Sequence, residues 1–194
     1  MIITTKNIFL SIKKKISNAK NNLVSVDEMA VYLGDIPPKG WSEKGKKCFI
    51  HTKNKALKGK RFSLLMASSN KQIISFKVIE KGFKTNDFND FFSFNIEKKL
   101  LNNKNILLDN ATIHKTKSFI KIAKKGKINL IYNIPYHSEF NPIENIFSLL
   151  RKKLQNTEIK NEKDIIETTL NFSHEISENK LENIFNHSFK LLNC

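Results

Sequence analysis

Short runs of hydrophobic residues, each bounded by polar or turn-forming residues, predict five β-strands. The predicted strands are residues 23–26, 61–67, 72–79, 105–108 and 128–134. A polar tetrad at 68–71 joins the second and third strands as a hairpin. A loop rich in proline and glycine, residues 37–45, separates the first two strands.

Hydrophobic residues at helical spacing predict helices between and after these strands. The first predicted helix begins at a cap at Thr85 or Asn86, and the second covers residues 115–125 and ends at Gly126. A third begins at Asn141, and residues 161–192 form one or two further amphipathic helices. Three strands therefore come first, and strands and helices alternate afterwards. This order is typical of an α/β domain with a mixed sheet.

The composition fits one globular domain that folds without disulfides. The chain has 194 residues, of which 40% are hydrophobic and 27% charged. No hydrophobic run approaches the ~20 residues of a membrane-spanning helix, and the N-terminus does not resemble a signal peptide. Two distant cysteines, Cys48 and Cys194, suggest a reducing compartment. These features exclude a secreted mini-protein, a membrane protein and a zinc-finger protein.

The net charge of +16 predicts a polyanionic partner, and nucleic acid is the most plausible one. The basic residues are 32 lysines and two arginines, Arg61 and Arg151. AT-rich coding accounts for this ratio, but it does not account for the excess of basic over acidic residues. Because lysine contacts phosphates rather than base edges, we expect salt-sensitive binding with little sequence preference.

Two aspartates, Asp27 and Asp109, directly follow the predicted strands 23–26 and 105–108. A carboxylate beside a buried core is costly unless it is paired or binds a metal. Ligand sites of open α/β sheets lie at the carboxyl ends of the strands, and Mg²⁺ prefers carboxylate oxygens. The alternative is that each aspartate simply begins a turn. The positions alone favour neither interpretation.

Glu144 is the third candidate carboxylate. It follows Asn141 and Pro142 at a predicted helix start, where Asn, Pro and Glu form a common capping pattern. Taken alone, the capping role is the simpler one. If the helix packs across the sheet, however, the same carboxylate can point at the two strand ends.

Three segments resemble the mariner-like DDE transposases, specifically their bacterial insertion-sequence branch. Residues 105–114, NILLDNATIH, resemble the strand-Asp-Asn-Ala-x-x-His motif, and residues 134–150, IPYHSEFNPIENIFSLL, resemble the Asn-Pro-Ile-Glu stretch. The 34 residues between Asp109 and Glu144 match the spacing of that branch. Residues 24–45, VSVDEMAVYLGDIPPKGWSEKG, resemble its first catalytic strand. His137 and Ser138 depart from the usual Ser-Pro of this motif.

The resemblance implies an RNase H-like fold with a mixed five-stranded sheet flanked by helices. It implies an Asp-Asp-Glu catalytic triad made of Asp27, Asp109 and Glu144, which would also hold the metal ions. In such enzymes two Mg²⁺ ions, for which Mn²⁺ can substitute, support DNA strand cleavage and then strand transfer by the 3′-hydroxyl. The alternatives are an inactive or domesticated DNA-binding remnant, or another RNase H-like nuclease.

Further residues are candidates for supporting roles. Those expected to position the triad are Glu28, Asn110, His114 and Asn141, each of which could instead be an ordinary turn, cap or surface residue. Those expected to contact DNA are Trp41, Lys115, Lys117, His137, Arg151 and Lys152, for which a solvated face or a loop anchor is the simpler alternative.

The expected organisation is a lead-in over residues 1–20, the catalytic domain over 21–155 and a C-terminal helical extension over 156–194. The resemblance implies transposon-end and target DNA as partners and a homodimer in the active complex. Family members carry helix-turn-helix units ahead of this domain. Because only about twenty residues precede Asp27, the sequence has no room for these units. The open alternatives are one half of a split transposase whose helix-turn-helix units lie on a separate polypeptide, a truncated remnant, or a captured domain. The expected location is the cytoplasm and nucleoid, or the nucleus or viral factory of another host.

Overall fold

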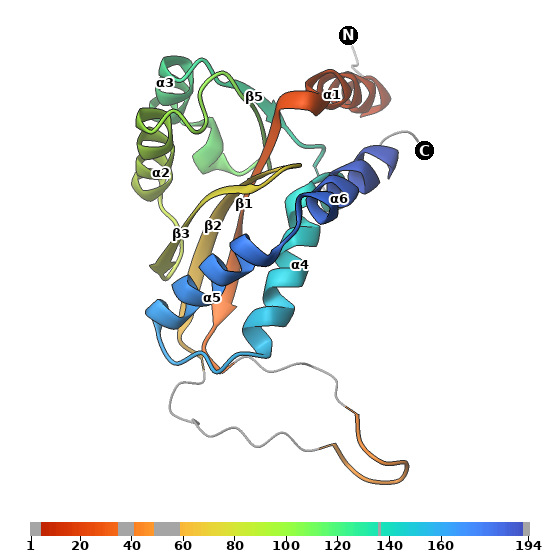
Figure 1. Ribbon diagram of the computed structural model, residues 1–194. Coiled ribbons are helices and arrows are strands. Elements are labelled where there is room, and N and C mark those ends of the chain that lie inside the picture. The colour runs from red at the N-terminus through yellow and green to blue at the C-terminus, as the bar shows by residue number, and fades with distance from the viewer. Residues whose placement is uncertain (1–4, 35–40, 49–58, 136, 192–194) are drawn as a thin grey trace.

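The computed structural model describes residues 5–34, 41–48, 59–135 and 137–191. Five strands form one mixed sheet in the order β3-β2-β1-β4-β5 (Figure 1). The strands are β1 Leu23–Tyr32, β2 Arg61–Ser69, β3 Ile73–Glu80, β4 Asn105–Leu108 and β5 Asn129–Tyr132. The helices are α1 Thr5–Ala19, α2 Thr85–Glu97, α3 Lys117–Lys125, α4 Pro142–Gln155, α5 Glu162–Glu175 and α6 Glu178–Leu191. Short 3₁₀ helices are η1 Lys20–Asn22, η3 Thr112–Lys115 and η4 Ser138–Phe140.

The five predicted strands are all present, but the first one is longer than predicted. β1 pairs with β2 in antiparallel fashion from Val24 to Tyr32, whereas β1, β4 and β5 are parallel to one another. Asp27 pairs with Met66 and therefore lies in the middle of β1, not after its end. The strand continues past the charged pair because β2 supplies backbone hydrogen bonds, and because Met29 and Val31 are buried beyond it.

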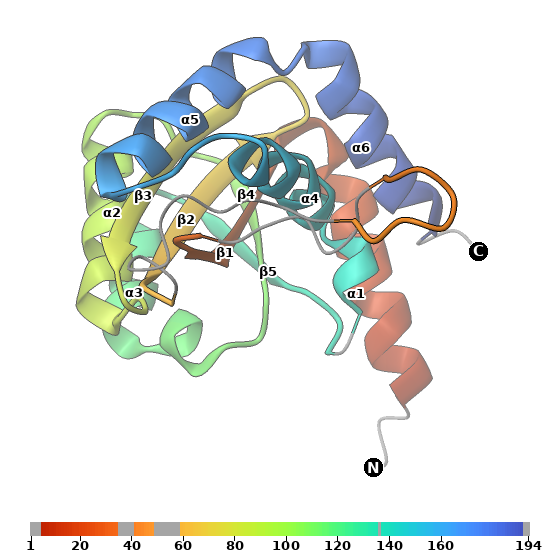
Figure 2. The same ribbon diagram turned by 90° about the horizontal axis from the view of Figure 1, so that it is seen from below.

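The sheet separates two hydrophobic cores (Figure 2). The aromatic core lies under α2 and α3 and contains Phe88, Phe91, Phe92 and Phe119. The mainly aliphatic core lies on the other face, where it includes buried residues of α1, α4, α5 and α6. Because side chains alternate along a strand, Val24 and Val26 face the aromatic core while Leu23 and Met29 face the aliphatic one.

Two predicted helix starts are corrected by the structure. Lys84, not Thr85 or Asn86, occupies the N-cap of α2, where its backbone N–H donates to Asp87 at 3.0 Å. The segment predicted as one helix over 115–125 is instead η3 followed by α3, and Thr116 caps α3 by accepting from the Phe119 N–H. Gly126 ends α3 as predicted.

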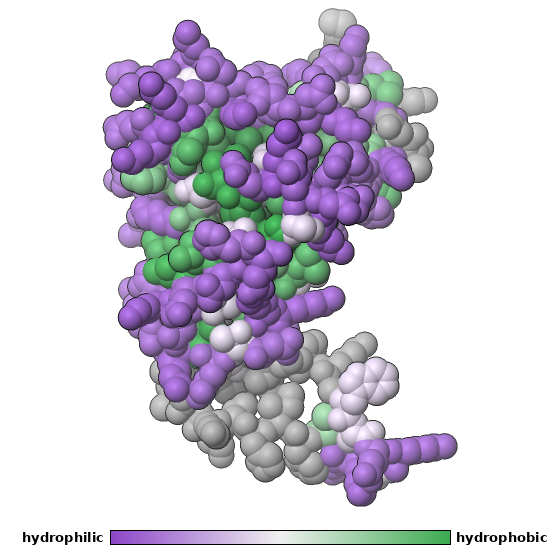
Figure 3. All heavy atoms as spheres, viewed as in Figure 1, coloured by the Kyte–Doolittle hydropathy of each residue, from purple (hydrophilic) through white to green (hydrophobic). Residues whose placement is uncertain are grey.

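Both ends of the chain contribute to the aliphatic core. Ile16 and Ala19 at the end of α1 are buried, as are Leu181 and Phe185 of α6. Hydrophilic residues cover most of the face seen in Figure 3, and hydrophobic residues show through mainly between α2 and α5. Among the described residues, no helix is long and apolar enough to cross a membrane. Part of the predicted loop, residues 37–40, lies outside the described residues.

Candidate active site

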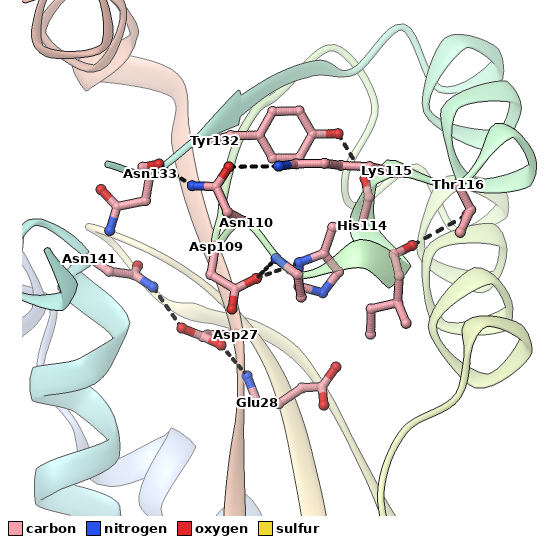
Figure 4. A network of polar contacts seen from close by, with 12 residues as sticks. Asp27, Glu28, Asp109, Asn110, His114, Lys115, Thr116, Tyr132, Asn133 and Asn141 are labelled. Atoms are coloured by element: carbon pink, nitrogen blue, oxygen red, sulfur yellow. Dashed lines mark hydrogen bonds and ion pairs between the residues drawn. The ribbon is translucent and has the colours of Figure 1, made fainter. Parts of the chain in front are cut away.

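Asp27 and Asp109 meet where the parallel pairing of β1 and β4 stops. The paired residues end with Ser25 opposite Leu107, and continuing that register by two residues brings Asp27 opposite Asp109. β4 ends at Leu108, so Asp109 is the first residue beyond it. The two aspartates therefore lie side by side across the opening, and Figure 4 shows their carboxylates close together.

Glu144 reaches the same place from the first turn of α4, which packs on β1. A cavity of about 490 Å³ is lined by all three carboxylates and by segments that follow β4 and β5. Its other lining residues are Asn110, Ala111, Asn133, Ile134, Pro135, His137, Ser138 and Asn141. Three elements far apart in the sequence thus present their carboxylates to one cavity.

Asp27 is held by two hydrogen bonds (Figure 4). The Glu28 N–H donates to its Oδ1 at 2.7 Å, and Nδ2 of Asn141 donates to its Oδ2 at 2.8 Å. The hydroxyl of buried Ser25 donates to Oδ1 of Asn141. Asn141 stands at the N-cap of α4, but its side chain makes no capping bond. It links α4 to β1 instead.

Ser25 was not among the sequence-predicted site residues. Its signal is a polar residue in the hydrophobic run 23–26, two positions before Asp27 and hence on the same face of the strand. The capping box considered for Glu144 would require an Asn141 side chain that accepts from the helix. That side chain faces Ser25 and Asp27, so Asn141 is the N-cap residue of α4 as predicted, but its side chain does not form the capping box.

Asp109 is held from the aromatic face of the sheet. The Ala111 N–H donates to its Oδ1 at 2.9 Å, and Nδ1 of His114 lies 2.7 Å from the same oxygen. His114 is 2% exposed, and its ring lies against Phe88 with centroids 4.4 Å apart. The imidazole thus fills the space between Asp109 and the aromatic core.

The three carboxylates differ in their pKa values. Burial raises the pKa of Asp27 to about 7, and the charges of Asp109 and Glu144 act in the same direction. The hydrogen bond from His114 lowers the pKa of Asp109. Burial raises the pKa of Glu144, while nearby Arg151 opposes the rise and Asp109 adds to it. The carboxylates therefore repel one another across the cavity, and a divalent cation would relieve this repulsion.

The donor set fits a hard divalent cation, because carboxylate oxygens are what Mg²⁺ and Mn²⁺ prefer. Within the described ranges, however, no three His, Cys, Asp or Glu side chains are already grouped closely enough to hold one ion. Asp27 and Asp109 point their oxygens at protein donors instead. The three carboxylates therefore line one cavity, but their oxygens do not converge on a single metal position.

Asn110 and Lys115 belong to a hydrogen-bonded cluster beside the cavity. Asn110 donates to the carbonyl of Asn133 and accepts from Nζ of Lys115 at 2.8 Å. The same ammonium lies 5.3 Å from the centroid of the Tyr132 ring, whose hydroxyl donates to the carbonyl of His114 at 2.7 Å. Asn110 therefore ties the ends of β4 and β5 together, and Lys115 is engaged within the protein.

The remaining predicted DNA contacts are scattered. His137 lines the cavity, and its Nδ1 lies 2.7 Å from Oε1 of Glu139. Arg151 is exposed and interacts electrostatically with Glu144, whereas Lys117 and Lys152 are exposed on α3 and α4. Trp41 is fully exposed and is not among the residues that line the cavity.

Asp27 of β1, Asp109 after β4 and Glu144 of α4 thus line one cavity beside a mixed five-stranded sheet. Residues 22–166 match the family of DDE superfamily endonucleases, and the chain belongs to this family. The predicted family and the RNase H-like fold are thereby confirmed. No curated protein sequence matches the chain.

Solved structures of the Mos1 transposase have the same fold. A Mos1 paired-end complex with the left transposon end superposes with a TM-score of 0.80 at 10% identity, covering 97% of this chain and 59% of that one. A Mos1 mariner paired-end complex with Mn gives the same values. The catalytic domain of Mos1 mariner transposase gives a TM-score of 0.71 at 10% identity, covering 97% and 88%. The chain thus spans 59% of the Mos1 chains in the paired-end complexes.

Proposed function

We propose that this chain is the catalytic domain of a cut-and-paste DNA transposase, which cleaves DNA strands and transfers the resulting 3′-hydroxyl. One observation carries the proposal: Asp27, Asp109 and Glu144, on three separate elements, line one cavity in a DDE endonuclease. These residues would hold two Mg²⁺ ions, for which Mn²⁺ substitutes. When bound, such ions activate the attacking oxygen and stabilise the leaving oxygen of the phosphodiester.

The contribution of the protein is to fix its ligands before the substrate arrives. Asn141 holds Asp27 through a bond that Ser25 orients in turn. The Ala111 N–H and His114 hold Asp109. Because Ser25, Asn141 and His114 are buried, these contacts hold the two aspartates in defined positions.

The proposed substrate is the backbone of transposon-end and target DNA. The net charge of +16 supports binding to phosphates. Lys117 is exposed on α3, and Arg151 and Lys152 are exposed on α4, the helix that carries Glu144. The proposed complex contains two copies of this chain and a helix-turn-helix polypeptide that reads the ends. It acts where the element resides: in the cytoplasm and nucleoid of a bacterium, or in a nucleus or viral factory.

The test is a Mn²⁺ titration of the purified chain by calorimetry and electron paramagnetic resonance. Wild type should bind, and Asp109→Asn should lose binding because one charged ligand is removed. Glu97→Gln, an exposed carboxylate of α2, is the matched control for loss of one charge and should bind like wild type.

Two results would contradict the proposal. Equal Mn²⁺ binding by Asp109→Asn and wild type would place the metal elsewhere. No binding in any variant, repeated with a short DNA duplex present, would favour the inactive remnant. Preference for an RNA–DNA hybrid or a four-way junction over linear duplex would instead favour another RNase H-like nuclease.

A further inference from the structure

Two neighbouring cavities follow α6 where this helix packs against α4, and together they are called the α4–α6 groove. Their volumes are about 280 and 550 Å³, and both are lined by Asn183 and His187 of α6. Asn145 and Ser148 of α4 line the first cavity, and Lys20 of η1 lines the second. Figure 1 shows α6 beside α4 and α1. The groove is therefore built from segments at both ends of the chain.

The groove begins beside the candidate active site. Ser148 lies four positions after Glu144 on α4, so the two side chains lie on the same side of the helix. Both residues are exposed, and Glu144 lines the carboxylate cavity whereas Ser148 lines the groove. α6 also packs on η4, whose Ser138 lines the carboxylate cavity. A strand that passes Glu144 would therefore meet the groove one helical turn further along α4, at about 5.4 Å.

Cationic and neutral polar side chains line the groove, although it lies in an acidic part of the chain. Residues 156–194 contain seven acidic residues and only four lysines. Two of these lysines, Lys180 and Lys190, line the groove, whereas none of the described residues that line it is Asp or Glu. Acidic side chains of this segment have partners elsewhere: Asp164 caps α5, and Glu175 forms an ion pair with a lysine of α4. The charge of the groove is opposite to that of its surroundings, which favours an anionic occupant.

The polar groups of the groove are available to a ligand. Among the described residues, the side chains of Asn145, Ser148 and His187 make no hydrogen bond, and Lys180 forms no ion pair. Nζ of Lys20 lies over the ring of a phenylalanine of α6, 5.6 Å from its centroid, which leaves the ammonium group its hydrogen-bond donors. Lysine, asparagine and serine contact the phosphates of DNA without reading its bases. The lining thus fits a phosphodiester backbone.

We propose that the α4–α6 groove binds the sugar-phosphate backbone of DNA where the strand leaves the carboxylate cavity along α4. This inference rests on the proposed function in that DNA is taken as the substrate. It gives α6 a role in the reaction, because a backbone held in the groove keeps the strand beside Glu144. Since the contacts are made to phosphates, binding in the groove does not depend on base sequence and weakens as the salt concentration rises.

The first test measures the affinity for a fluorescent DNA duplex in chelator over a series of salt concentrations. Asn183→Asp places a carboxylate in the groove without changing the size of the side chain, and it should weaken binding by about tenfold or more. Lys180→Gln removes one cation, and it should make the slope of log affinity against log salt shallower by about one. Asn171→Asp and Lys163→Gln, at exposed positions of α5, are the controls with the same charge changes and should bind like wild type.

The second test locates the DNA by NMR of the ¹⁵N-histidine-labelled chain. His187 lines both cavities of the groove, whereas His174 is an exposed residue of α5 that lines neither. His187→Gln and His174→Gln assign the two sets of ring signals. Adding the duplex should shift the signals of His187 and leave those of His174 in place. Equal shifts at both rings, or no shift at His187, would overturn the inference.

The affinities can overturn the inference in two further ways. An equal loss of affinity in the groove variants and in their α5 controls would show that net charge, not the groove, binds DNA. An unchanged DNA affinity in Asn183→Asp, together with a wild-type dimer that this variant abolishes in analytical ultracentrifugation, would assign the groove to an acidic surface of a second copy.

The Mn²⁺ titration separates this inference from the proposed function. Asn183→Asp and Lys180→Gln should bind Mn²⁺ like wild type, because neither residue lines the carboxylate cavity. If wild type binds no Mn²⁺, the proposed function fails, whereas DNA binding in chelator still decides the role of the groove. If wild type binds Mn²⁺ but the groove variants bind DNA as well as wild type does, the groove inference fails alone.

Discussion

The two faces of the sheet supply the candidate site in different ways. On the face covered by α4, the polar groups form a complete chain from Ser25 through Asn141 to Asp27. On the face covered by α2 and α3, the ring of His114 packs against Phe88. Among the described residues, Oε1 of Glu28 and both ring nitrogens of His114 are buried without a hydrogen-bond partner, although Nδ1 lies 2.7 Å from Oδ1 of Asp109. One face satisfies the polar groups of the site with side-chain hydrogen bonds, whereas the other leaves buried polar atoms without them.

The difference suggests a division of roles. The α4 face contains Asp27 and Glu144, and it opens into the cavity. On the aromatic face His114 is buried, and it contacts Asp109 from the protein side. Asp27 and Glu144 therefore lie on the α4 face of the sheet, whereas the side chains that contact the two aspartates, Asn141 and His114, come from opposite faces.

The largest effect is expected from the carboxylates themselves. Asp27→Ala, Asp109→Ala and Glu144→Ala should each reduce metal-dependent cleavage of duplex DNA to background, because each removes a ligand, while DNA binding persists. Nicking assays with Mg²⁺ and with Mn²⁺, beside a DNA-binding assay in chelator, measure both properties. Cleavage retained by any one variant would remove that residue from the triad.

Removing a ring from the aromatic core should lower the stability of the fold. Phe88→Ala deletes a fully buried ring that contacts Phe92, Phe119 and His114, so the free energy of unfolding should fall by about 3–5 kcal/mol. Urea denaturation followed by circular dichroism measures the loss. Phe94→Ala, at an exposed position of the same helix, is the control and should change little.

The half-buried carboxylate of Asp27 should make stability depend on pH. Its pKa is about 7 in the folded chain against 3.8 ordinarily, so folding disfavours its ionised form. Its stabilising contribution is therefore present below pH ~4 and is lost as the pH rises to ~7. Asp27→Asn should remove this loss and be more stable than wild type at pH 8, by about 2–4 kcal/mol. Urea denaturation at pH 4.5 and pH 8 measures the difference. A stability gap between the two proteins that does not grow with pH would contradict it.

The smallest expected effect comes from substituting Asn141. It distinguishes a side chain that caps α4 from one that connects Ser25 to Asp27 by hydrogen bonds. Serine is as good an N-cap residue as asparagine, but it is too short to join Ser25 to Asp27. Asn141→Ser should therefore destabilise the chain by about 1–2 kcal/mol. Asn161→Ser at the start of α5, where the side chain does cap by accepting from the Asp164 N–H, is the control and should be nearly neutral. Thermal unfolding of both variants decides between the two roles.

Much of the fold could be predicted from local patterns. The strand 105–108 is hydrophobic from Ile106 to Leu108 because β4 is buried between β1 and β5, and Gly126 ends its helix as its residue type indicates. The hydrophobic pattern predicts that the first strand ends at residue 26. β1 extends beyond Asp27 to Tyr32 because it pairs with β2, and this pairing does not depend on a hydrophobic run. The cap of α2 was missed because the Asp87 side chain bonds the backbone of Lys84, which local preference does not reveal.

By itself the sequence determined the α/β class, the order of elements and the three carboxylates, since hydrophobic period and motif spacing are local properties of the chain. Only the tertiary structure decided what surrounds them. Asn141 bonds Asp27 across 114 residues, and Ser25 bonds Asn141 across 116. The environment of His114 depends on the packing of Phe88 from another helix. Hydrogen bonds and burial of this kind arise from contacts between distant segments, and no local pattern encodes them.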